Sequence, residues 1–362
     1  MNKIDQLLQL LQGKEYFIVY GEGVAAREVL ACLSCEYLNF NVTNIAITQG
    51  EKITDLEIND IPVTYIESLT AYAKDALVLI ATSQRYHEEI KEHLHKLGFK
   101  SVLYLTRELV YELNRNAYIN AFKKYNIETT SKVINLGGVF LLNPLNEFER
   151  KSGNINQLGD IVFPSVYNDW SFVHEGPYEF NNVTLCAGDI VLDLGSNSGV
   201  FSALAASRGC FSYAFEPTLE MRNVIEEHSK MNGGKINVIP MAVSDKDGEV
   251  TFNIAEDDDG SNTISTRLGK VKEQRTVKCI SIDSFVKQQK LQRVDFIKAD
   301  IEGAERKMIE GAKKTLMMYA PKLAICTYHY KDDPEVLEKM IKAANPNYKV
   351  IHKWQKLYAY VE

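Results

Sequence analysis

A glycine-bounded turn that follows a short apolar run is the part of this sequence best suited to hold a ligand. Residues 191–194 (Val-Leu-Asp-Leu) supply the run, which is typical of a strand covered on both faces. Gly195 and Gly199 bound the turn and allow its backbone to approach a ligand closely. Ser196 and Asn197 between them suit a turn and a helix cap. We therefore predict a strand, a ligand-binding turn and the start of a helix.

The spacing within this turn indicates which ligand it would take. No Gly-Lys-Ser/Thr follows Gly199, as a phosphate loop requires, and Asn197 stands where the dinucleotide fingerprint has a glycine. An acidic residue, Asp193, precedes the first glycine and favours a cationic ligand over a pyrophosphate. S-adenosylmethionine, with its sulfonium and ammonium groups, is such a ligand. An ordinary strand-to-helix turn is the alternative.

Two later strand ends would complete a nucleoside site. Glu216 and Pro217 follow the next predicted strand, and a carboxylate there can accept hydrogen bonds from both ribose hydroxyls. Met241 and Ala242 lie at the end of a strand predicted over residues 237–243, where an adenine could rest on apolar side chains. The alternative for Glu216 is a surface glutamate at a strand end.

A charged motif follows the strand predicted over residues 294–299. Residues 298–305 read Lys-Ala-Asp-Ile-Glu-Gly-Ala-Glu, so that charged residues alternate with small apolar ones at the carboxyl end of the strand. A helix cap would explain Asp300 alone, but it would not explain Lys298, which stands within the strand. The motif is therefore expected to face the ligand site.

Transfer of a methyl group to a hydroxyl needs a base for the departing proton. We predict His329, at the end of the strand over residues 322–327, or Asp300 as that base; the histidine is favoured because imidazole titrates near neutral pH. Lys298 would orient the acceptor or stabilise the developing oxyanion. A histidine packed between Tyr328 and Tyr330 is the alternative.

No metal site is predicted. Cys32 and Cys35 form one CxxC without a second pair and fall on a predicted helix, which favours core packing over a redox or metal role. The three aspartates at 257–259 lack the ligand spacing of a calcium loop and are predicted to lie at the tip of a hairpin. Ser261 and Asn262 beside them could border a substrate.

The elements beyond residue 181 alternate strand and helix. The last two predicted strands, over residues 349–353 and 357–361, are close enough to form a hairpin, which places one antiparallel strand in a parallel sheet. We expect an α/β domain over residues 181–362 with a doubly wound sheet of seven strands and this hairpin at its end.

Residues 191–361 resemble the FkbM-type family of S-adenosylmethionine-dependent methyltransferases, which have the class I methyltransferase fold. The resemblance rests on residues 193–199, Phe215-Glu-Pro217, Ala242-Val-Ser-Asp245 and above all on residues 298–305. It implies O-methylation, often of sugars or polyketide hydroxyls, in bacterial surface-glycan or secondary-metabolite synthesis. The expected acceptor is therefore a sugar or another small molecule.

A smaller α/β domain of Rossmann type is predicted over residues 1–110. Gly21, Gly23 and Ala26 have a nucleotide-binding spacing, but the strand over residues 44–48 is not followed by the acid that would hold a ribose. Further strands are expected over residues 15–20, 76–81 and 101–105, with a helix over 88–97. A nucleotide-sugar or NAD(P)-dependent enzyme acting through this domain is one alternative function, and a non-catalytic binding protein is another.

Residues 111–180 are predicted to form a bridge. A helix is expected over residues 107–124, followed by irregular chain around Gly137 and Gly138. Aromatic and acidic residues gather over 168–179, where they would form a lid over the substrate or simply pack as a connector.

The composition excludes some partners. The 362 residues carry a net charge of −7 and no run of basic residues, which argues against nucleic acid. No stretch approaches the ~20 apolar residues that a membrane helix needs, and the start of the chain lacks the apolar core of a signal peptide. The scattered cysteines suggest reduced thiols, so we expect a cytoplasmic enzyme. A homodimer is a further expectation.

Overall fold

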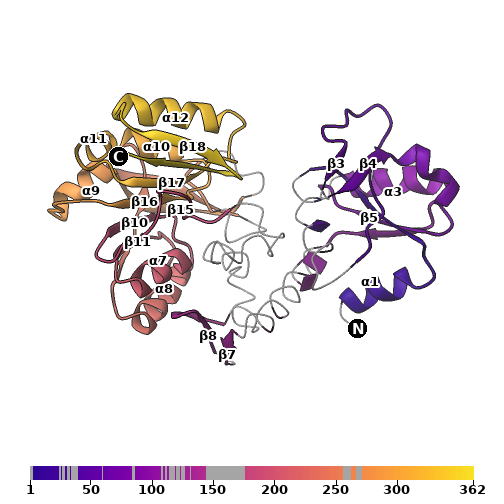
Figure 1. Cartoon of the computed structure of the whole chain (residues 1–362), viewed down its shortest axis with the longest axis horizontal. Coiled ribbons are helices and arrows are strands. Elements are labelled where there is room, and N and C mark those ends of the chain that lie inside the picture. Colours follow the sequence, from indigo (N-terminus) through magenta and orange to yellow (C-terminus); the bar gives the residue numbers. More distant parts are fainter. Residues whose placement is uncertain are drawn as a thin grey trace. The chain divides into compact units, whose positions relative to one another are not determined.

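The structure is a computed structural model of the chain. It describes residues 3–143, 176–255, 262–265 and 271–362, apart from residues 59, 84–85 and 131 and scattered positions within 24–39 and 107–126. The chain divides into two compact units, with a boundary in the sequence between residues 126 and 127 (Figure 1). No helix among these described residues is long and apolar enough to cross a membrane.

The first unit contains a six-stranded sheet in the order β3-β4-β2-β1-β5-β6, in which only the contact of β3 with β4 is antiparallel. The four predicted strands are confirmed, whereas β3 and β4 were not predicted. The helix predicted over residues 88–97 is α3, and the helix predicted to end near Cys35 lies largely outside the described residues. The strands are β1 (Tyr16–Tyr20), β2 (Asn44–Ile47), β3 (Glu57–Ile58), β4 (Ile61–Tyr65), β5 (Ala76–Ile80) and β6 (Ser101–Tyr104), and the helices are α1 (Lys3–Leu11), the 3-10 helix η1 (Ile66–Tyr72) and α3 (His87–Lys96).

The second unit contains a seven-stranded sheet in the order β12-β11-β10-β16-β17-β19-β18. Strand β19 runs antiparallel to both of its neighbours, so the predicted terminal hairpin is confirmed. This is the predicted doubly wound sheet of seven strands. Its strands are β10 (Ile190–Leu194), β11 (Phe211–Phe215), β12 (Ile236–Ile239), β16 (Phe296–Ala299), β17 (Lys322–Cys326), β18 (Lys349–Lys353) and β19 (Lys356–Tyr360).

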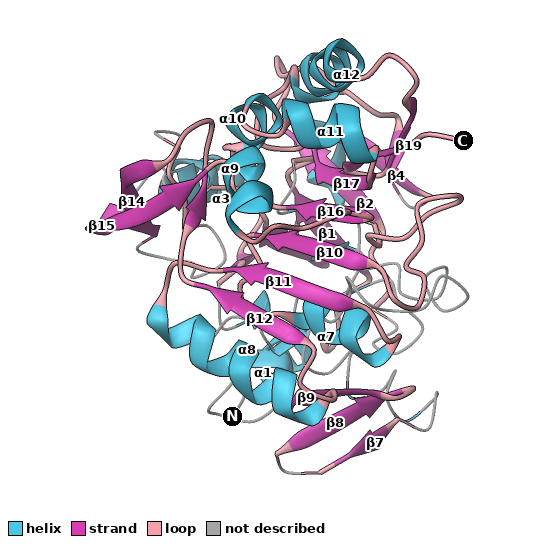
Figure 2. Cartoon of the chain, turned by 90° about the vertical axis from the view of Figure 1, so that its left-hand side faces the viewer, coloured by secondary structure: helices cyan, strands magenta, loops and turns pink. Residues whose placement is uncertain are grey.

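Helices cover both faces of this sheet, as Figure 2 shows. On one face lie α7 (Val200–Ser207) and α8 (Leu219–Met231), and on the other α9 (Ile282–Gln288), α10 (Glu305–Glu310), α11 (Lys313–Tyr319) and α12 (Asp333–Ala344). Leu192, Ile297 and Ile325 are buried in one core cluster with residues of α9 to α12. Because alternate residues of a strand face opposite sides, Lys298 points toward the face covered by α7.

The strand predicted over residues 237–243 is wrong as a single element. β12 ends before Pro240, and the two residues of β13 (Ala242–Val243) leave the main sheet to pair with β15 (Val271–Ile280). Proline has no N–H to continue a ladder, which explains the break. The predicted antiparallel hairpin is confirmed as β14 (Gly248–Ala255) and β15. Its acidic tip, with Ser261, lies outside the described residues.

The prediction of irregular chain around Gly137 and Gly138 is also wrong. These glycines, with φ of 62° and 96°, form the tight turn of a small antiparallel sheet. The sheet contacts α8, since the Leu142 N–H donates to His228 Nε2 at 3.0 Å. Its strands are β7 (Glu128–Thr129), β8 (Val133–Leu136) and β9 (Val139–Leu142). Most of the helix predicted over residues 107–124, and residues 168–175 of the expected lid, lie outside the described chain.

Candidate active site

A cavity opens where the carboxyl ends of β10, β11, β12 and β16 meet, the usual place for a ligand in an open α/β sheet. It holds about 530 Å³ of space, open solvent included. Seven of the predicted cofactor residues line it: Gly195, Asn197, Glu216, Pro217, Met241, Ala242 and Asp300. The other lining residues are mostly apolar, and they are Phe215, Val243, Phe252, Asn262, Ile264, Ile301, Glu302 and Ala304.

The two glycines of the turn are required by packing within the protein. Gly195 has φ of 69°, and a Cβ on it would lie 1.9 Å from the carbonyl oxygen of Asp300. A Cβ on Gly199, where φ is 75°, would lie 2.9 Å from the side chain of Ile225. We had expected glycine here for close approach to a ligand. The structure adds a second reason, because these glycines bring the ends of β10 and β16 together and seat α7 against α8.

Ser196 and Asn197, which lie between the two glycines, differ in their contacts. The Ser196 hydroxyl donates to the carbonyl of Phe215 at 3.2 Å and is buried, so it ties the turn to β11 rather than lining the cavity. Asn197 adopts φ of 48° and lines the cavity. Its Oδ1 is buried without a hydrogen-bond partner among the described residues. A bound molecule with an N–H or O–H group would satisfy this acceptor.

Glu216 brings a nearly buried carboxylate to the cavity, with 6% of its surface exposed. Its Oε1 accepts hydrogen bonds from the N–H and the hydroxyl of Thr218, at 2.7 Å and 2.6 Å. Burial raises the pKa of Glu216 to about 7, although the hydrogen bonds from Thr218 act in the opposite direction. The carboxyl group is therefore held in one orientation and is poised to ionise when a ligand donates hydrogen bonds to it.

Asp193 and Lys298 lie opposite each other on β10 and β16 and form a buried ion pair of 3.2 Å. Lys298 Nζ also donates to the carbonyl of Gly195 at 2.7 Å, and Ser202 Oγ donates to Asp193 Oδ2 at 2.7 Å. Neither side chain lines the cavity. The predicted contacts of Asp193 with the cofactor and of Lys298 with the acceptor are therefore corrected: the pair holds the turn from behind.

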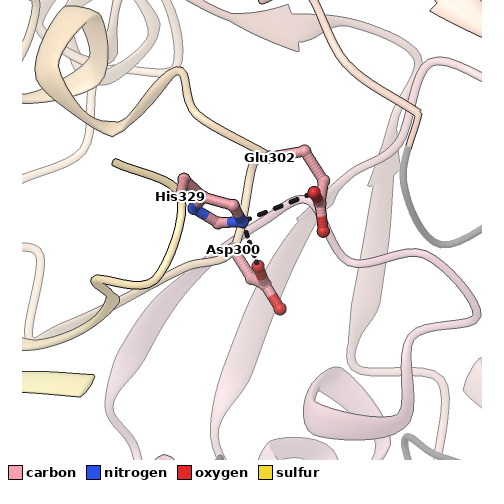
Figure 3. A group of neighbouring side chains, drawn as sticks. All are labelled: Asp300, Glu302 and His329. Atoms are coloured by element: carbon pink, nitrogen blue, oxygen red, sulfur yellow. Dashed lines mark ion pairs between the residues drawn. The ribbon is translucent and has the colours of Figure 1, made fainter. Parts of the chain in front are cut away.

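His329 is surrounded by carboxylates. Its Nε2 lies 3.4 Å from Glu302 Oε2 and 3.7 Å from Asp300 Oδ1 (Figure 3), and its Nδ1 lies 3.1 Å from Glu305 Oε1. Burial by itself would lower the pKa of His329, but the carboxylates of Glu302 and Glu305 raise it to about 10. The choice of His329 as a base that titrates near neutral pH is therefore wrong for this environment, and its side chain does not line the cavity.

Asp300 reaches the cavity and is fixed by two tyrosines. Tyr178 Oη donates to Asp300 Oδ2 at 2.9 Å, and Tyr328 Oη donates to Oδ1 at 3.1 Å. Burial would raise the pKa of Asp300, but the positive charges of Lys298 and His329 lower it. The contact of Tyr178 was not predicted, because no local pattern relates it to a residue so far along the chain.

Glu302 is the main site residue that sequence reasoning did not single out. It lines the cavity with a left-handed backbone conformation, φ 53°, and burial raises its pKa to about 6. The signal was available within the charged motif, since a glutamate directly before Gly303 at a strand end favours a turn that aims its side chain. A non-glycine residue held at positive φ is often found at functional sites.

Comparison with known families decides what kind of domain carries this cavity. Residues 193–350 match the model of the methyltransferase FkbM domain. This segment is an FkbM methyltransferase domain. The match spans the turn, Glu216 and the whole charged motif, and it ends within β18.

Individual proteins similar to this chain were also found. The hexuronic acid methyltransferase AglP of Haloferax volcanii is 25% identical over 159 residues, which are 43% of this chain and 62% of that protein. A solved FkbM methyltransferase of Methylobacillus flagellatus KT aligns over 98% of this chain and 92% of its own, with 16% identity and a TM-score of 0.42. The precorrin-6y C5,15-methyltransferase of Geobacter metallireducens GS-15 aligns over 49% and 80%, with 12% identity and a TM-score of 0.29.

The first unit, outside the FkbM domain, has a cavity of its own at the ends of β1, β2 and β5. Gly21 and Gly23 line it, and a Cβ on Gly21 would lie 2.8 Å from the carbonyl of Ala81. Thr48 follows β2 as predicted and pairs with the Tyr20 hydroxyl, while Glu51 lies farther along the same wall. A nucleotide in this cavity stays a prediction.

Proposed function

We propose that this protein is an S-adenosylmethionine-dependent methyltransferase that methylates a hydroxyl group of a sugar or glycan precursor. One observation carries the proposal: within an FkbM methyltransferase domain, a cavity joins the turn at residues 195–199 to the nearly buried carboxylate of Glu216. Glu216 is suited to the two ribose hydroxyls of the cofactor. The unsatisfied Oδ1 of Asn197 suits a donor group of the same molecule.

The reaction is an in-line displacement at the methyl carbon of the cofactor. The acceptor oxygen forms a bond to that carbon while the carbon–sulfur bond breaks, and the electron pair stays on sulfur to give S-adenosylhomocysteine. The hydroxyl proton leaves to a base. Positioning of the two reactants supplies most of the rate enhancement in such a reaction.

Of the residues predicted to assist, Asp300 is the one with a carboxylate at the cavity, so we propose it as the proton acceptor. Tyr178 and Tyr328 orient that carboxylate. Lys298 contributes by holding the carbonyl of Gly195.

A sugar acceptor is supported by two observations. AglP, which is named as a hexuronic acid methyltransferase, is a relative of the FkbM domain. The polar side chains of Asn262 and Glu302 also line the cavity, which suits an acceptor rich in hydroxyl groups.

Calorimetry with S-adenosylhomocysteine and transfer of a labelled methyl group to a panel of sugar nucleotides, including hexuronic acids, test the proposal. We expect one cofactor site per chain and label in at least one sugar. Glu216→Ala should weaken cofactor binding and lower the incorporation of label, while Glu220→Ala, a matched change to an exposed glutamate on α8, should leave both unchanged. Absence of cofactor binding by the wild-type protein would overturn the proposal.

The cavity of the first unit favours a second candidate, a nucleotide-sugar or NAD(P)-dependent activity. Thermal unfolding in the presence of NADH, NADPH or S-adenosylmethionine distinguishes the two. The proposed methyltransferase is stabilised by the last of these, and stabilisation by a nicotinamide cofactor alone would favour the second candidate.

A further inference from the structure

One group of side chains at the cavity rim has the composition of a metal site. We propose that Asp300, Glu302 and His329 bind a divalent cation, which holds the hydroxyl of the methyl acceptor. The role of the cation rests on the proposed function, whereas the site itself rests on the geometry of these three side chains. One ligand atom from each lies within 4.8 Å of the others (Figure 3).

The separation of His329 from Glu302 fits two ligands of a shared ion better than it fits a hydrogen bond, and Asp300 lies slightly farther away. His329 Nε2 lies 3.4 Å from Glu302 Oε2 and 3.7 Å from Asp300 Oδ1. Two ligand atoms about 2.1 Å from one cation, at an angle of about 90–110°, stand about 3.0–3.5 Å apart. A good N–H···O hydrogen bond is shorter, at about 2.9 Å.

His329 supplies the second, independent observation. Its side chain is fully buried, yet neither ring nitrogen has a partner with hydrogen-bond geometry among the described residues. Nε2 is aimed between the two carboxylates at the cavity, and Nδ1 faces Glu305 Oε1 at 3.1 Å. A metal-bound histidine commonly has its second nitrogen beside a carboxylate, which fixes the ring and its tautomer.

The two carboxylates are also held in place. Asp300 accepts hydrogen bonds from the hydroxyls of Tyr178 and Tyr328, which resembles the outer shell of partners around metal ligands. Glu302 keeps a left-handed backbone, φ 53°, and its carbonyl accepts a hydrogen bond from Thr263 Oγ1 at 2.7 Å. Such strain persists where the surrounding structure enforces it, and here it aims the carboxylate at His329.

A neighbouring group of Glu305, His329 and Asp333 is a weaker candidate. Asp333 already pairs with Arg306 at 2.8 Å and accepts the N–H of Tyr330 at 2.8 Å, so its charge is compensated. Asp300 and Glu302 line the cavity, whereas Glu305 and Asp333 do not. The Nε2 side of His329 is therefore the side on which a cation would reach both protein and substrate.

Two carboxylates and one imidazole favour a cation that accepts mixed oxygen and nitrogen ligands, such as Mn²⁺, Co²⁺ or Zn²⁺, over Mg²⁺. With three protein ligands, positions remain for the acceptor hydroxyl. Coordination would lower the pKa of that hydroxyl and would fix its oxygen beside the donor methyl group, while the proton leaves to the Asp300 oxygen that does not bind the cation.

Titration of the chelator-treated full chain with Mn²⁺, Zn²⁺ and Mg²⁺, followed by calorimetry, tests the site. We expect one Mn²⁺ or Zn²⁺ per chain and weaker Mg²⁺ binding. His329→Gln and Glu302→Gln should each weaken Mn²⁺ binding at least tenfold. The matched control is His352→Gln, which alters an exposed histidine paired with Glu338 at 2.8 Å and should leave binding unchanged.

Thermal unfolding of each variant without metal shows whether it is folded, and Glu302→Gln, at the cavity surface, keeps the test valid if His329→Gln unfolds. Absence of one-to-one binding, or binding undiminished in a folded variant, overturns the proposal. S-adenosylhomocysteine binding measured with chelator present separates the two proposals. Cofactor binding without metal binding removes the cation site alone, whereas metal binding without cofactor binding removes the proposed function.

Discussion

The two walls of the cavity differ in where their charged side chains lie. The loop wall, formed by Gly195, Asn197 and Glu216, presents backbone and one carboxylate, while its strongest charges, Asp193 and Lys298, are paired behind it. The acidic wall, formed by Asp300 and Glu302 around His329, gathers its charges at the cavity itself. The loop wall suits a ligand that is recognised by its shape. The acidic wall suits a reacting group that loses a proton.

Two buried histidines show how far local partners decide charge. His228, behind the loop wall, donates from Nδ1 to the carbonyl of Ser198 at 2.8 Å and accepts the Leu142 N–H, and burial lowers its pKa to about 4. His329 is equally buried, but carboxylates raise its pKa to about 10. Burial alone therefore does not predict the charge of a histidine, because the neighbouring groups can reverse its effect.

The largest effect is expected from breaking the pair behind the loop wall. Lys298→Met leaves Asp193 buried without its cation, and we expect the free energy of unfolding to fall by about 3–5 kcal/mol. Denaturant unfolding measures the loss. Lys342→Met, which breaks an exposed pair with Glu338, is the control and should cost under about 1 kcal/mol. Equal losses in the two variants would show that the buried pair is not structural.

The next effect concerns the carboxylate of the loop wall. Glu216→Ala removes the acceptor proposed for both ribose hydroxyls, and the affinity for S-adenosylhomocysteine should drop by about 2–4 kcal/mol. Calorimetry at fixed pH measures the drop, with Glu220→Ala as the control. Unchanged affinity would remove Glu216 from the cofactor site.

On the acidic wall, a substitution can remove one of the hydrogen bonds that orient the carboxylate of Asp300. Tyr178→Phe removes the hydroxyl that donates to Asp300 Oδ2, and a hydrogen bond to a charged group contributes about 1.5–3 kcal/mol. We expect a stability loss in that range together with slower methyl transfer at unchanged cofactor affinity. A loss of cofactor affinity as well would mean that the two walls are not independent.

The smallest effect is a pH dependence on the loop wall. Because the pKa of Glu216 is about 7, its carboxyl group is protonated at pH 6 and ionised at pH 8. The ionised form accepts two hydroxyl donors, so affinity for S-adenosylhomocysteine should rise about tenfold over this interval and then level off. In Glu216→Gln the rise should disappear. A rise that persists in this variant would assign the titration to another group.

The same ionisation also affects stability. An unfolded glutamate ionises near 4.5, below the folded pKa of about 7, so the folded state binds an extra proton between these values. Stability contributed by this group is therefore present below about pH 4.5 and is lost as pH rises through 7. The stability of Glu216→Gln relative to the wild type should accordingly increase over this interval, which denaturant unfolding at pH 5 and pH 8 measures.

Much of the fold could be predicted because most strands of the two large sheets are short apolar runs with glycine or charged residues at their ends. The failures have local causes. Gly137-Gly138 was interpreted as irregular chain although it separates two short apolar runs, which is a hairpin pattern. The apolar residues on both sides of Pro240 favour one continuous strand, but the proline ends β12. β4 was not predicted because it contains Pro62, and proline is uncommon within strands.

The sequence by itself determined most strands of the two large sheets, the terminal hairpin and the positions of the turn, of Glu216 and of the charged motif. These follow from local spacing, since a strand end and a turn are encoded by adjacent residues. The tertiary structure decided which charged side chains meet the ligand. Lys298 and Asp300 are two residues apart, yet one pairs with Asp193 inside the protein and the other reaches the cavity. The charge of His329 likewise depends on carboxylates that only the fold brings around it, because electrostatic effects depend on distance in space rather than along the chain.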